Sequence, residues 1–496
     1  MSTDRGMKLG LALALASSAC SGGGGPDSGP PDAPRCAPED LVDRVPVENA
    51  SALAGGDLDL LFGYRGGTRE GIAAAPQDDG SLIVWNTRSV TSMVELSVDG
   101  QIRPVRHGPY GEMRSDGAGL MFRAYDGASA VGTGEPVLFS FEAFSIDSGE
   151  TIAEAEPFPL PSVCDGVGPY SPHVSDGRYL TIRAPCGAGP RRIAERWEDR
   201  GGTLEVVAGP YGMPDADSGG INRSAFADGR GGLFFLGIPP RLIDGSDRRL
   251  VVTHWDGDTA PVESESIGPL GTTTDFGRAT PYRDGTLAAA VNHVIDGELT
   301  TVVARVDRDA RILWTWQSPD GFFSGPNYPA IAIAGAQELI VVLVRPRELR
   351  TAYVMRLDPL GRPRWAEPRA LPWPGLFDIE LTAVVGHPTG TFHVGWFPGS
   401  IGWFDAEAEP LWDEPLYGGT SDFARLQMFA DGREGIWLTD SGFMGGYVAH
   451  YDTSQWSLFR VWGYPGCGGR RGIVTRESPD AEPRTWWGPF PFGNAP

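Results

Sequence analysis

Short apolar runs separated by turn residues make up most of the chain. Runs of this length, rich in Val, Leu and Phe, predict β-strands. An Asp-Gly pair between two runs predicts a hairpin, because both turn residues can take positive φ. No helical period longer than a turn or two is present. The Asp-Gly pairs are Asp79-Gly80, Asp116-Gly117, Asp176-Gly177, Asp228-Gly229, Asp284-Gly285 and Asp431-Gly432.

A third apolar run in each unit ends at an Asp, and in three units a Trp follows seven residues later. The Asp positions are 47 to 57 residues apart, and a period near 50 with strand-like units is typical of a toroidal repeat fold. The positions are Asp99, Asp147, Asp199, Asp256, Asp307, Asp358, Asp405 and Asp452, with Trp314, Trp365 and Trp412. The predicted units are 71–108, 109–160, 168–208, 220–266, 276–318, 327–370, 378–416 and 422–464.

Eight four-stranded units without helices predict an all-β fold, an eight-bladed β-propeller. Stacking the units around an axis buries both faces of each sheet, and the periodic Trp would fill the space between neighbouring blades. Seven blades is the second alternative, with the second or seventh unit merged into a neighbour. A pair of β-sandwiches is the third, although the Asp period crosses the chain without a linker.

Three copies of the unit, VARVDRDARILWTW, VMRLDPLGRPRWAE and IGWFDAEAEPLWDE, resemble the repeat of the quinoprotein-like (PQQ-like) eight-bladed propellers. The resemblance covers roughly residues 295–420 and implies the fold rather than an activity. It also implies that the repeated Asp accepts backbone N–H bonds in its turn. Enzymes of that family hold the quinone on the axis, and many stack it against a disulfide between adjacent cysteines. This chain has no adjacent cysteines, so no cofactor is predicted.

The composition narrows the classes of partner. The net charge is −23, and Lys8 is the only lysine. Nucleic-acid binding needs clustered positive charge, so it is excluded. Removal of the leader would leave no lysine, which also excludes Schiff-base chemistry and a P-loop lysine.

The N-terminus predicts a lipid anchor. Residues 1–19 combine Arg5 and Lys8 with an apolar segment too short to span a bilayer. Ser17-Ser18-Ala19-Cys20 resembles the lipobox of bacterial lipoproteins, which implies acylation of Cys20; an ordinary secretory signal peptide is the alternative. The Gly- and Pro-rich residues up to 35 predict a flexible tether. Residues 36–70 would lead into a propeller at 71–466.

Four further cysteines are available for disulfides in an oxidising envelope compartment. Of the three pairings, Cys164–Cys186 and Cys36–Cys467 are favoured, because the first flanks one repeat and the second would tie the ends of the ring together. Free thiols are the alternative for each pair. The spacing of the cysteines does not fit a metal site.

Candidate sites for chemistry are few. Acidic pairs such as Asp256 and Asp258 could bind Ca²⁺, although solvated turns more often have this composition. Residues 145–152 resemble the Asp box of sialidases, with Ile152 in place of Trp. His254, His387 and His393 lie beside aromatic residues or hairpins and fit no catalytic motif.

The predicted function is therefore that of a monomeric, non-enzymatic binding or scaffold lipoprotein of the bacterial cell envelope. It would be attached to the outer membrane, on the periplasmic or the outer side, and bind a protein or a glycan. The alternative is an enzyme with a site on the propeller axis, either a quinone-dependent oxidoreductase or a glycan hydrolase. The aromatic tail, residues 467–496, is expected to pack on the propeller and otherwise to bind a partner.

Overall fold

The computed structural model describes residues of the unit Glu39–Pro496 and none of the unit Met1–Pro38. All five cysteines, the leader, the tether and Asp99 lie outside the described residues, so the predicted lipid and disulfides remain predictions. The described ranges are 72–86, 91–98, 102–108, 111–127, 138–159, 170–183, 193–213, 225–237, 250–268, 272–295, 297–324, 329–345, 348–373, 380–397, 400–413, 415–417, 427–440, 447–453, 459–463, 471–475 and 484–488.

The strands form eight sheets, here called blades 1 to 8 in chain order. Blades 1 to 4 contain β1 (Ile72–Pro76), β2 (Leu82–Asn86), β3 (Thr91–Leu96) and β4 (Ile102–Gly108); β5 (Gly111–Ser115), β6 (Leu120–Gly127), β7 (Leu138–Ser145), β8 (Thr151–Glu154) and the short β9 (Phe158–Pro159); β10 (Tyr170–Ser175), β11 (Arg178–Arg183), β12 (Ile193–Asp199) and β13 (Leu204–Gly212); and β14 (Ala225–Ala227), β15 (Leu233–Gly237), β16 (Val251–Trp255) and β17 (Val262–Glu263). Blades 5 to 8 contain β18 (Thr272–Pro281), β19 (Leu287–Ile295), β20 (Glu298–Val306) and β21 (Ile312–Gln317); β22 (Ala330–Ala334), β23 (Glu338–Arg345), β24 (Glu348–Leu357) and β25 (Arg369–Ala370); β26 (Glu380–Gly386), β27 (Phe392–Phe397), β28 (Ser400–Phe404) and β29 (Leu416–Tyr417); and β30 (Gln427–Ala430), β31 (Ile436–Asp440), β32 (Tyr447–Tyr451) and β33 (Phe459–Gly463), with β34 (Arg471–Thr475) and β35 (Arg484–Gly488) added.

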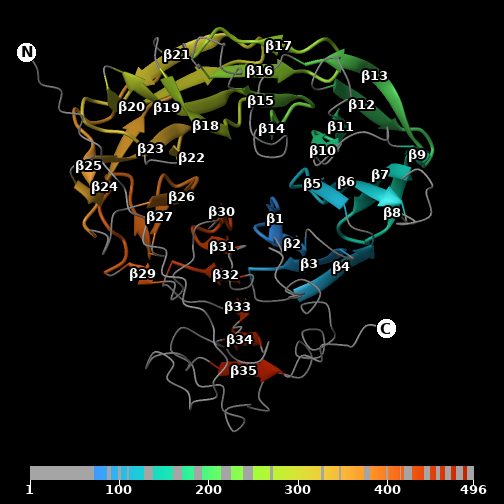
Figure 1. Ribbon diagram of the computed structural model, residues 1–496. Helices are drawn as coiled ribbons and strands as arrows, with labels where there is room; N and C mark the ends of the chain where they lie inside the picture. The colour runs from blue at the N-terminus through green and yellow to red at the C-terminus, as the bar shows by residue number, and fades with distance from the viewer. Residues whose placement is uncertain are drawn as a thin grey trace, which may run out of the picture. The chain divides into compact units, whose positions relative to one another are not determined.

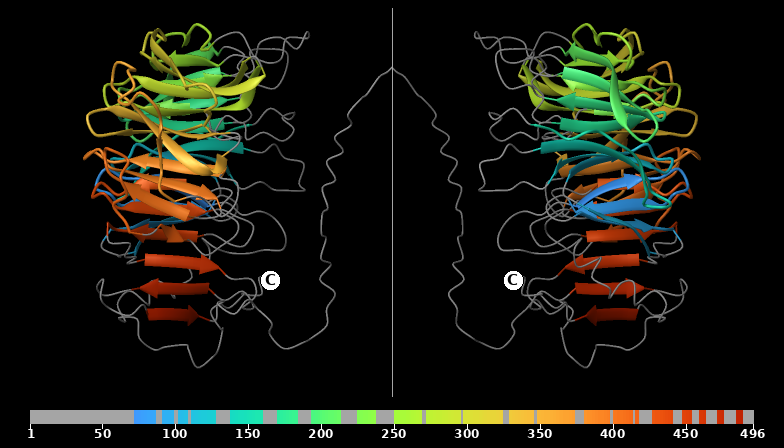
Figure 2. Two further views of the ribbon diagram at one scale, coloured as in Figure 1. Left: turned by 90° about the vertical axis from the view of Figure 1, so that its left-hand side faces the viewer. Right: turned by 90° about the vertical axis from the view of Figure 1, so that its right-hand side faces the viewer.

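Within each blade the strands follow chain order and pair antiparallel with their neighbours, except that the short β9 pairs with β7. The first strand of each blade lies nearest the axis and the later strands lie toward the rim (Figure 1). First strands of successive blades contact each other, as β18 does with β22 and β22 with β26. Seen from the side, the strands run along the axis of the ring (Figure 2). The chain is an eight-bladed β-propeller, which confirms the predicted fold and the count of eight.

The continuous apolar run of β23 shows why middle strands do not alternate between polar and apolar residues. Leu339, Val341 and Leu343 belong to a core cluster shared with blade 5. The intervening Ile340, Val342 and Val344 belong to a cluster shared with blade 7. Because a blade has a neighbour on each face, both sets of side chains are buried and both must be apolar.

Two kinds of turn lie on one end of the ring, called here the turn face: the turns that join first to second strands and those that join third to fourth strands. In the second kind, the periodic Asp accepts backbone N–H bonds through Oδ1. Asp307 and Asp405 each accept two such bonds at 2.8 and 2.9 Å, and Asp358 accepts two at 2.9 Å. Asp147 differs, because its carboxylate is exposed and lies 3.6 Å from Arg103 of blade 1. The carboxylate fixes the turn because it satisfies N–H groups that no strand partner reaches.

All six Asp-Gly pairs lie in the predicted hairpins between first and second strands, although only one of these turns has positive φ at both residues of the pair. Only Asp176 has a positive φ, 48°, followed by Gly177 at 71° in a two-residue turn. In the other five pairs only the glycine has positive φ, and the Asp acts as a hydrogen-bond acceptor, as Asp116 does for the N–H groups of Ala118 and Leu120. These turns are longer, and in blades 2, 4 and 8 a second residue, Gly119, Gly231 or Glu434, also has positive φ.

The periodic Trp residues join successive blades. Trp314 of blade 5 donates its Nε1–H to the carbonyl oxygen of Pro359, one residue after the repeated Asp of blade 6, at 3.0 Å. Trp412 of blade 7 donates in the same way to Thr453 of blade 8 at 2.7 Å. Gly361 lies against the Trp314 ring, where an added Cβ would come within 2.5 Å of a ring carbon. The indole is therefore both an apolar wedge and a hydrogen-bond donor between blades.

The ring closes between blade 8 and blade 1 without an exchanged strand among the described residues. Fully buried Trp437 of β31 donates its Nε1–H to the carbonyl oxygen of Gly80 in the first turn of blade 1, at 2.8 Å. A Cβ on Gly80 would lie 2.0 Å from the carbonyl oxygen of Asp431. Close approach of these two turns is thus possible only with glycine at position 80.

Two strands from the C-terminal tail, β34 and β35, extend the sheet of blade 8 outward. The side chains of Trp486 and Trp487 lie outside the described set, so their packing stays a prediction.

Trp437→Phe is expected to lower the free energy of unfolding by about 2–3 kcal/mol. The change leaves the buried Gly80 carbonyl without its donor and opens a small cavity. Urea unfolding checks the value, with Leu360→Ala as control, because Leu360 is 62% exposed and its loss should cost under about 0.5 kcal/mol. Equal losses in the two variants would show that the closing bond contributes nothing.

Candidate functional site

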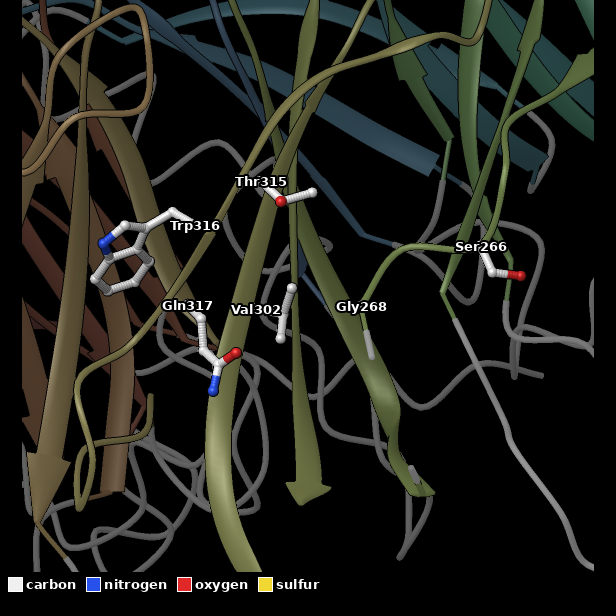
Figure 3. Close-up of a pocket in the computed structure, with 6 residues that line it drawn as sticks. All are labelled: Ser266, Gly268, Val302, Thr315, Trp316 and Gln317. Atoms are coloured by element: carbon white, nitrogen blue, oxygen red, sulfur yellow. The ribbon is translucent and has the colours of Figure 1, made fainter. Parts of the chain in front are cut away.

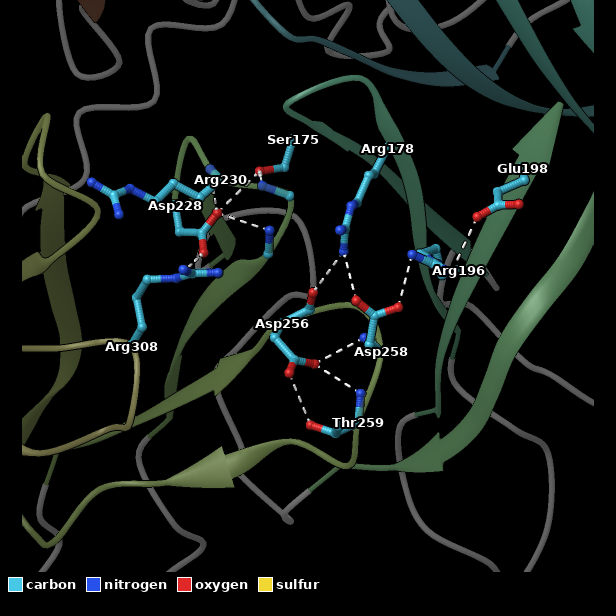
Figure 4. A network of polar contacts seen from close by, with 12 residues as sticks. Ser175, Arg178, Arg196, Glu198, Asp228, Arg230, Asp256, Asp258, Thr259 and Arg308 are labelled. Atoms are coloured by element: carbon cyan, nitrogen blue, oxygen red, sulfur yellow. Dashed lines mark hydrogen bonds and ion pairs between the residues drawn. The ribbon is translucent and has the colours of Figure 1, made fainter.

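A buried carboxylate, Asp228, bonds to groups of blades 3, 4 and 5 on the turn face (Figure 4). It lies in the turn between β14 and β15, and its Oδ1 accepts the backbone N–H groups of Arg230 and Gly232, both at 2.8 Å. Its Oδ2 lies 3.0 Å from Nε2 of His254 in β16. The same oxygen accepts a bond from Nε of Arg308 in blade 5, at 2.9 Å. Four groups from two blades therefore converge on one carboxylate.

These bonds keep Asp228 ionised. Burial alone would raise the pKa of Asp228, but the bonds from His254 and the two backbone N–H groups, with the charge of Arg308, hold the pKa well below its usual range. Ser175 of blade 3 also donates its hydroxyl to Asp228 Oδ1, at 3.3 Å. The Ser hydroxyl thus bonds to the carboxylate and not to the imidazole. A Ser–His–Asp relay requires the hydroxyl on the imidazole, so this constellation lacks the geometry of a nucleophile and its base.

The Asp228 cluster also leaves no room for a substrate. A Cβ on Gly232 would lie 2.6 Å from the Trp255 carbonyl oxygen and 2.7 Å from Asp228 Oδ2. Asp228, His254 and Ser175 are each at most 4% exposed. The cluster is a closed set of bonds that hold blades 3, 4 and 5 together.

Blade 8 repeats the arrangement. Asp431 accepts the backbone N–H groups of Arg433 and Gly435, and its Oδ2 lies 2.7 Å from Nε2 of His450. The aromatic neighbour is repeated as well: Phe234 in blade 4 and Trp437 in blade 8 each lie 4.6 Å from the imidazole beside them. A pair found in two blades belongs to the repeat, which favours a structural role.

The acidic cluster considered for Ca²⁺ is occupied by protein donors. Asp256 Oδ1 accepts the backbone N–H groups of Asp258 and Thr259, both at 2.8 Å. The carboxylate of Asp258 pairs with Arg178 at 2.9 Å and with Arg196 at 2.8 Å (Figure 4). Within the described ranges, no group of three or more His, Cys, Asp and Glu side chains could hold a metal ion.

The candidate histidines of the seventh unit lie in contact with each other. Nε2 of His387 is 2.8 Å from Nδ1 of His393, and both rings are buried. His173 is likewise buried, bonded to Ser171 at 2.9 Å. Burial, with a contribution from the charge of Arg114, lowers the pKa of His173 to about 3. These histidines are neutral interior groups at physiological pH.

The sequence contains a further repeated position besides the Asp and the Trp. The residue two positions before each repeated Asp points from the third strand toward the turns. In blades 5 and 6 it is Arg305 and Arg356, which donate to Pro359 and Ala406 in the next blade at 2.7 and 3.0 Å. In blades 4 and 8 it is His254 and His450, which bond to an Asp of their own blade, and in blade 7 it is Trp403. The position thus links blades directly where it is Arg, and its chemistry varies around the ring.

A pocket of about 340 Å³ lies between the outer parts of blades 4 and 5 (Figure 3). Its opening follows from strand lengths: β17 has two residues and β21 has six. Trp314 and Trp316 pack toward blade 6, so the alternate residues Thr315 and Gln317 face blade 4 and are exposed. The lining residues are Ser266, Gly268, Val302, Thr315, Trp316 and Gln317.

The innermost strands carry a mixed set of side chains. In β5, Glu112 and Arg114 are half-buried, and in β18 Arg278 is exposed. In β22, Ile331 and Ile333 are half-buried. Charged and apolar side chains thus both occur on the described parts of the innermost strands.

The chain is similar in fold to several solved structures. No protein-family model and no curated protein sequence matches the chain. Similar solved structures include a puromycin hydrolase (16% identity, TM-score 0.39, covering 86% of this chain and 60% of that one). Others are the Dos1 propeller (10%, 0.40, 75% and 90%) and a europium-containing methanol dehydrogenase (10%, 0.40, 74% and 81%). The chain thus spans 60% of the hydrolase, and at these identities the likeness concerns the fold alone.

The described part of the chain contains no helix long and apolar enough to cross a membrane.

Arg356→Met is expected to destabilise the protein by about 3–5 kcal/mol, because it leaves Glu338 and two backbone carbonyls without a buried donor. Arg356 is 1% exposed and donates to the carbonyl oxygens of Gly390 and Ala406 as well as to Glu338. Arg311→Met is the control: Arg311 is 76% exposed, and an exposed pair contributes at most about 1 kcal/mol. Similar unfolding midpoints for the two variants would refute the bracing role.

Asp228→Asn tests the ionised state of the buried carboxylate through pH. The folded pKa of Asp228 is lowered, so its stabilisation is present above the unfolded value, about 3.9, and is lost as pH falls toward the folded pKa. The difference in unfolding free energy between wild type and Asp228→Asn should therefore be constant from pH 7 to 5 and shrink below pH 4. A difference that does not change with pH would contradict this assignment.

Proposed function

We propose that the protein is a lipid-anchored envelope protein of a bacterium whose β-propeller serves as a binding module. The lipobox-like Ser17-Ser18-Ala19-Cys20 and the Gly- and Pro-rich residues after it support the anchor and the tether. A ring of blades held away from a membrane by a flexible segment presents its two faces to soluble or surface partners. The expected partner is a protein or a glycan.

The proposal rests on the charged groups of the turn face, which bond to neighbouring blades. Asp228, Asp258, Arg305 and Arg356 each bond to a neighbouring blade. Asp228, Arg305 and Arg356 are buried, and a ligand could recruit them only by breaking the bonds that brace the ring. The carboxylate of Asp258 is half exposed, but it is already paired with Arg178 and Arg196. Recognition is therefore assigned to the opposite end of the strands.

The described pocket between blades 4 and 5 fits this assignment. Its exposed Thr315 and Gln317 lie at the end of β21 away from the turn that Asp307 anchors. Hydroxyl and amide groups beside aliphatic surface suit the hydroxyls of a glycan or the backbone of a peptide better than they suit an ion.

An enzyme with a site on the axis is the second candidate. It draws support from the ionisable Glu112, Arg114 and Arg278 on the inner strands. Incubation of the purified protein with envelope glycan fragments separates the two, because a binding module retains unchanged glycan and a hydrolase releases shorter products. A dye-linked alcohol oxidation assay tests the oxidoreductase.

Cys20→Ala is expected to move the protein from the membrane fraction to the soluble envelope fraction and to abolish palmitate labelling. Without the thiol there is no acceptor for the lipid, and a short leader does not hold a protein in a bilayer. Ser18→Ala, which keeps small residues before the Cys, is the matched control and should stay membrane-bound. Unchanged fractionation and labelling in Cys20→Ala would disprove the anchor.

A further inference from the structure

The pair His387–His393 lies between blades 7 and 8 and is unlike the corresponding groups in other blades. His387 occupies the first turn of blade 7, and His393 lies in β27; both are at most 1% exposed. They share a single hydrogen bond, of 2.8 Å, between His387 Nε2 and His393 Nδ1. The outer nitrogens, His387 Nδ1 and His393 Nε2, have no partner among the described residues.

The pair is coupled to the packing of the next blade. The ring of His393 stacks on Trp403, with centroids 5.8 Å apart and planes 9° from parallel. It also meets Trp412 edge to face at 5.1 Å. Trp412 donates to Thr453 in blade 8 and shares a core cluster with residues of that blade. A shift of His393 therefore disturbs the surface that blade 8 packs on.

The number of protons on the two rings decides whether their hydrogen bond survives. Its hydrogen bond needs one N–H and one lone pair on the two facing nitrogens. The neutral pair therefore keeps the bond with either ring as the donor. One added proton also keeps it, as an imidazolium donating to an imidazole. A second added proton places N–H groups on both facing nitrogens, which removes the bond and leaves two buried cations.

The charges around the pair come from both neighbouring blades. From blade 8, Asp431 and Glu434 face His387, while Asp431 is itself bonded to His450, and Arg433 follows in the same turn. On the side of blade 6, the guanidinium of Arg356 donates a hydrogen bond to the carbonyl oxygen of Gly390, three residues after His387. Glu338 neutralises that guanidinium. The two blade-8 carboxylates favour one proton on His387 and do not reach His393, which faces Trp403 and Trp412.

We propose that His387 and His393 make the interface between blades 7 and 8 an acid-sensitive joint, closed at neutral pH and opening reversibly in mild acid. The open interface exposes both imidazoles to water, where each can take a proton. The closed interface accepts at most one.

The direction with pH follows from linkage. Burial lowers the pKa of His387, against the opposing charges of Asp431 and Glu434, and burial with the neighbouring His387 lowers the pKa of His393. A base whose closed-state pKa is lowered loses closed-state stability as pH falls below the open value, about 6.5. The opening constant should rise about tenfold per pH unit for one extra proton bound in the open state, and up to about a hundredfold for two.

Other blades supply a matched variant. The position of His387 is filled in blades 4 and 8 by Asp228 and Asp431, which accept the backbone N–H groups two and four residues on. His387→Asp places the same acceptor before Thr389 and Thr391 and gives His393 a carboxylate partner. A carboxylate favours protonated His393, so the variant should lose the acid response or reverse it.

Hydrogen exchange of the full-length protein, corrected for intrinsic rates, tests the joint. Between pH 6.5 and 5.5, protection in peptides of β27–β28 and β30–β31 should fall at least about fivefold more than in β20–β21, where Arg305 joins blades 5 and 6. Protection should return at pH 7.5. In His387→Asp the same peptides should change by less than about threefold relative to β20–β21.

Two results would overturn the proposal: an equal loss of protection in both regions of the wild type, or an undiminished acid response in His387→Asp. If His387→Asp does not fold, His393→Phe replaces it. Phe keeps the ring stacked on Trp403 and removes the shared bond, leaving one titrating imidazole. The acid response should then be no steeper than tenfold per pH unit, and a steeper response would contradict the proposal.

Discussion

The ring depends on one kind of hydrogen bond between blades. In it, a side chain of one blade donates to a backbone carbonyl just after the repeated Asp of the next blade. Trp314 and Arg305 of blade 5 both donate to the carbonyl oxygen of Pro359 in blade 6. That carbonyl is in position only because Asp358 holds its turn through two backbone N–H groups. A local hydrogen bond thus sets the geometry of a contact between units about 50 residues apart in the sequence. Apolar burial supplies most of the stabilisation between blades, and these bonds fix how the blades are oriented.

The architecture was predictable because it is repeated. A strong Asp and Trp pattern in blades 5 to 7 fixed the period, and weaker units such as the one ending at Asp199 could then be located by spacing. Details that depend on one turn were less predictable. The two-residue turn of Asp176 has the positive φ expected of an Asp-Gly hairpin, whereas Asp116 and Asp228 act as acceptors in longer turns. Residue identity alone does not distinguish these uses, because both follow from a short carboxylate beside a glycine.

The bracing groups were missed for a different reason. In the sequence His254 stands beside Trp255 and fits no catalytic motif, and its partner, Asp228, lies 26 residues earlier. Arg305 and Arg356 occupy the same position in their blades as His254, two residues before the repeated Asp. A pattern that allows Arg, His or Trp at one position is visible only after the units are aligned on the Asp. The recognition surface has no such period, so its chemistry cannot be obtained from the repeat.

The residue two positions before the repeated Asp differs between blades, so the interfaces between blades differ in charge. Interfaces braced by Arg305 or Arg356 contain a guanidinium that is charged at every physiological pH. Blade 7 has Trp403 at that position and His387 in the turn, so its interface with blade 8 depends on neutral rings. Because a propeller is closed by contacts all round, the interface that weakens first as conditions change decides where the ring yields. In this chain the substitution of imidazole for carboxylate at residue 387 selects that interface, although the apolar packing on either side resembles that of the other blades.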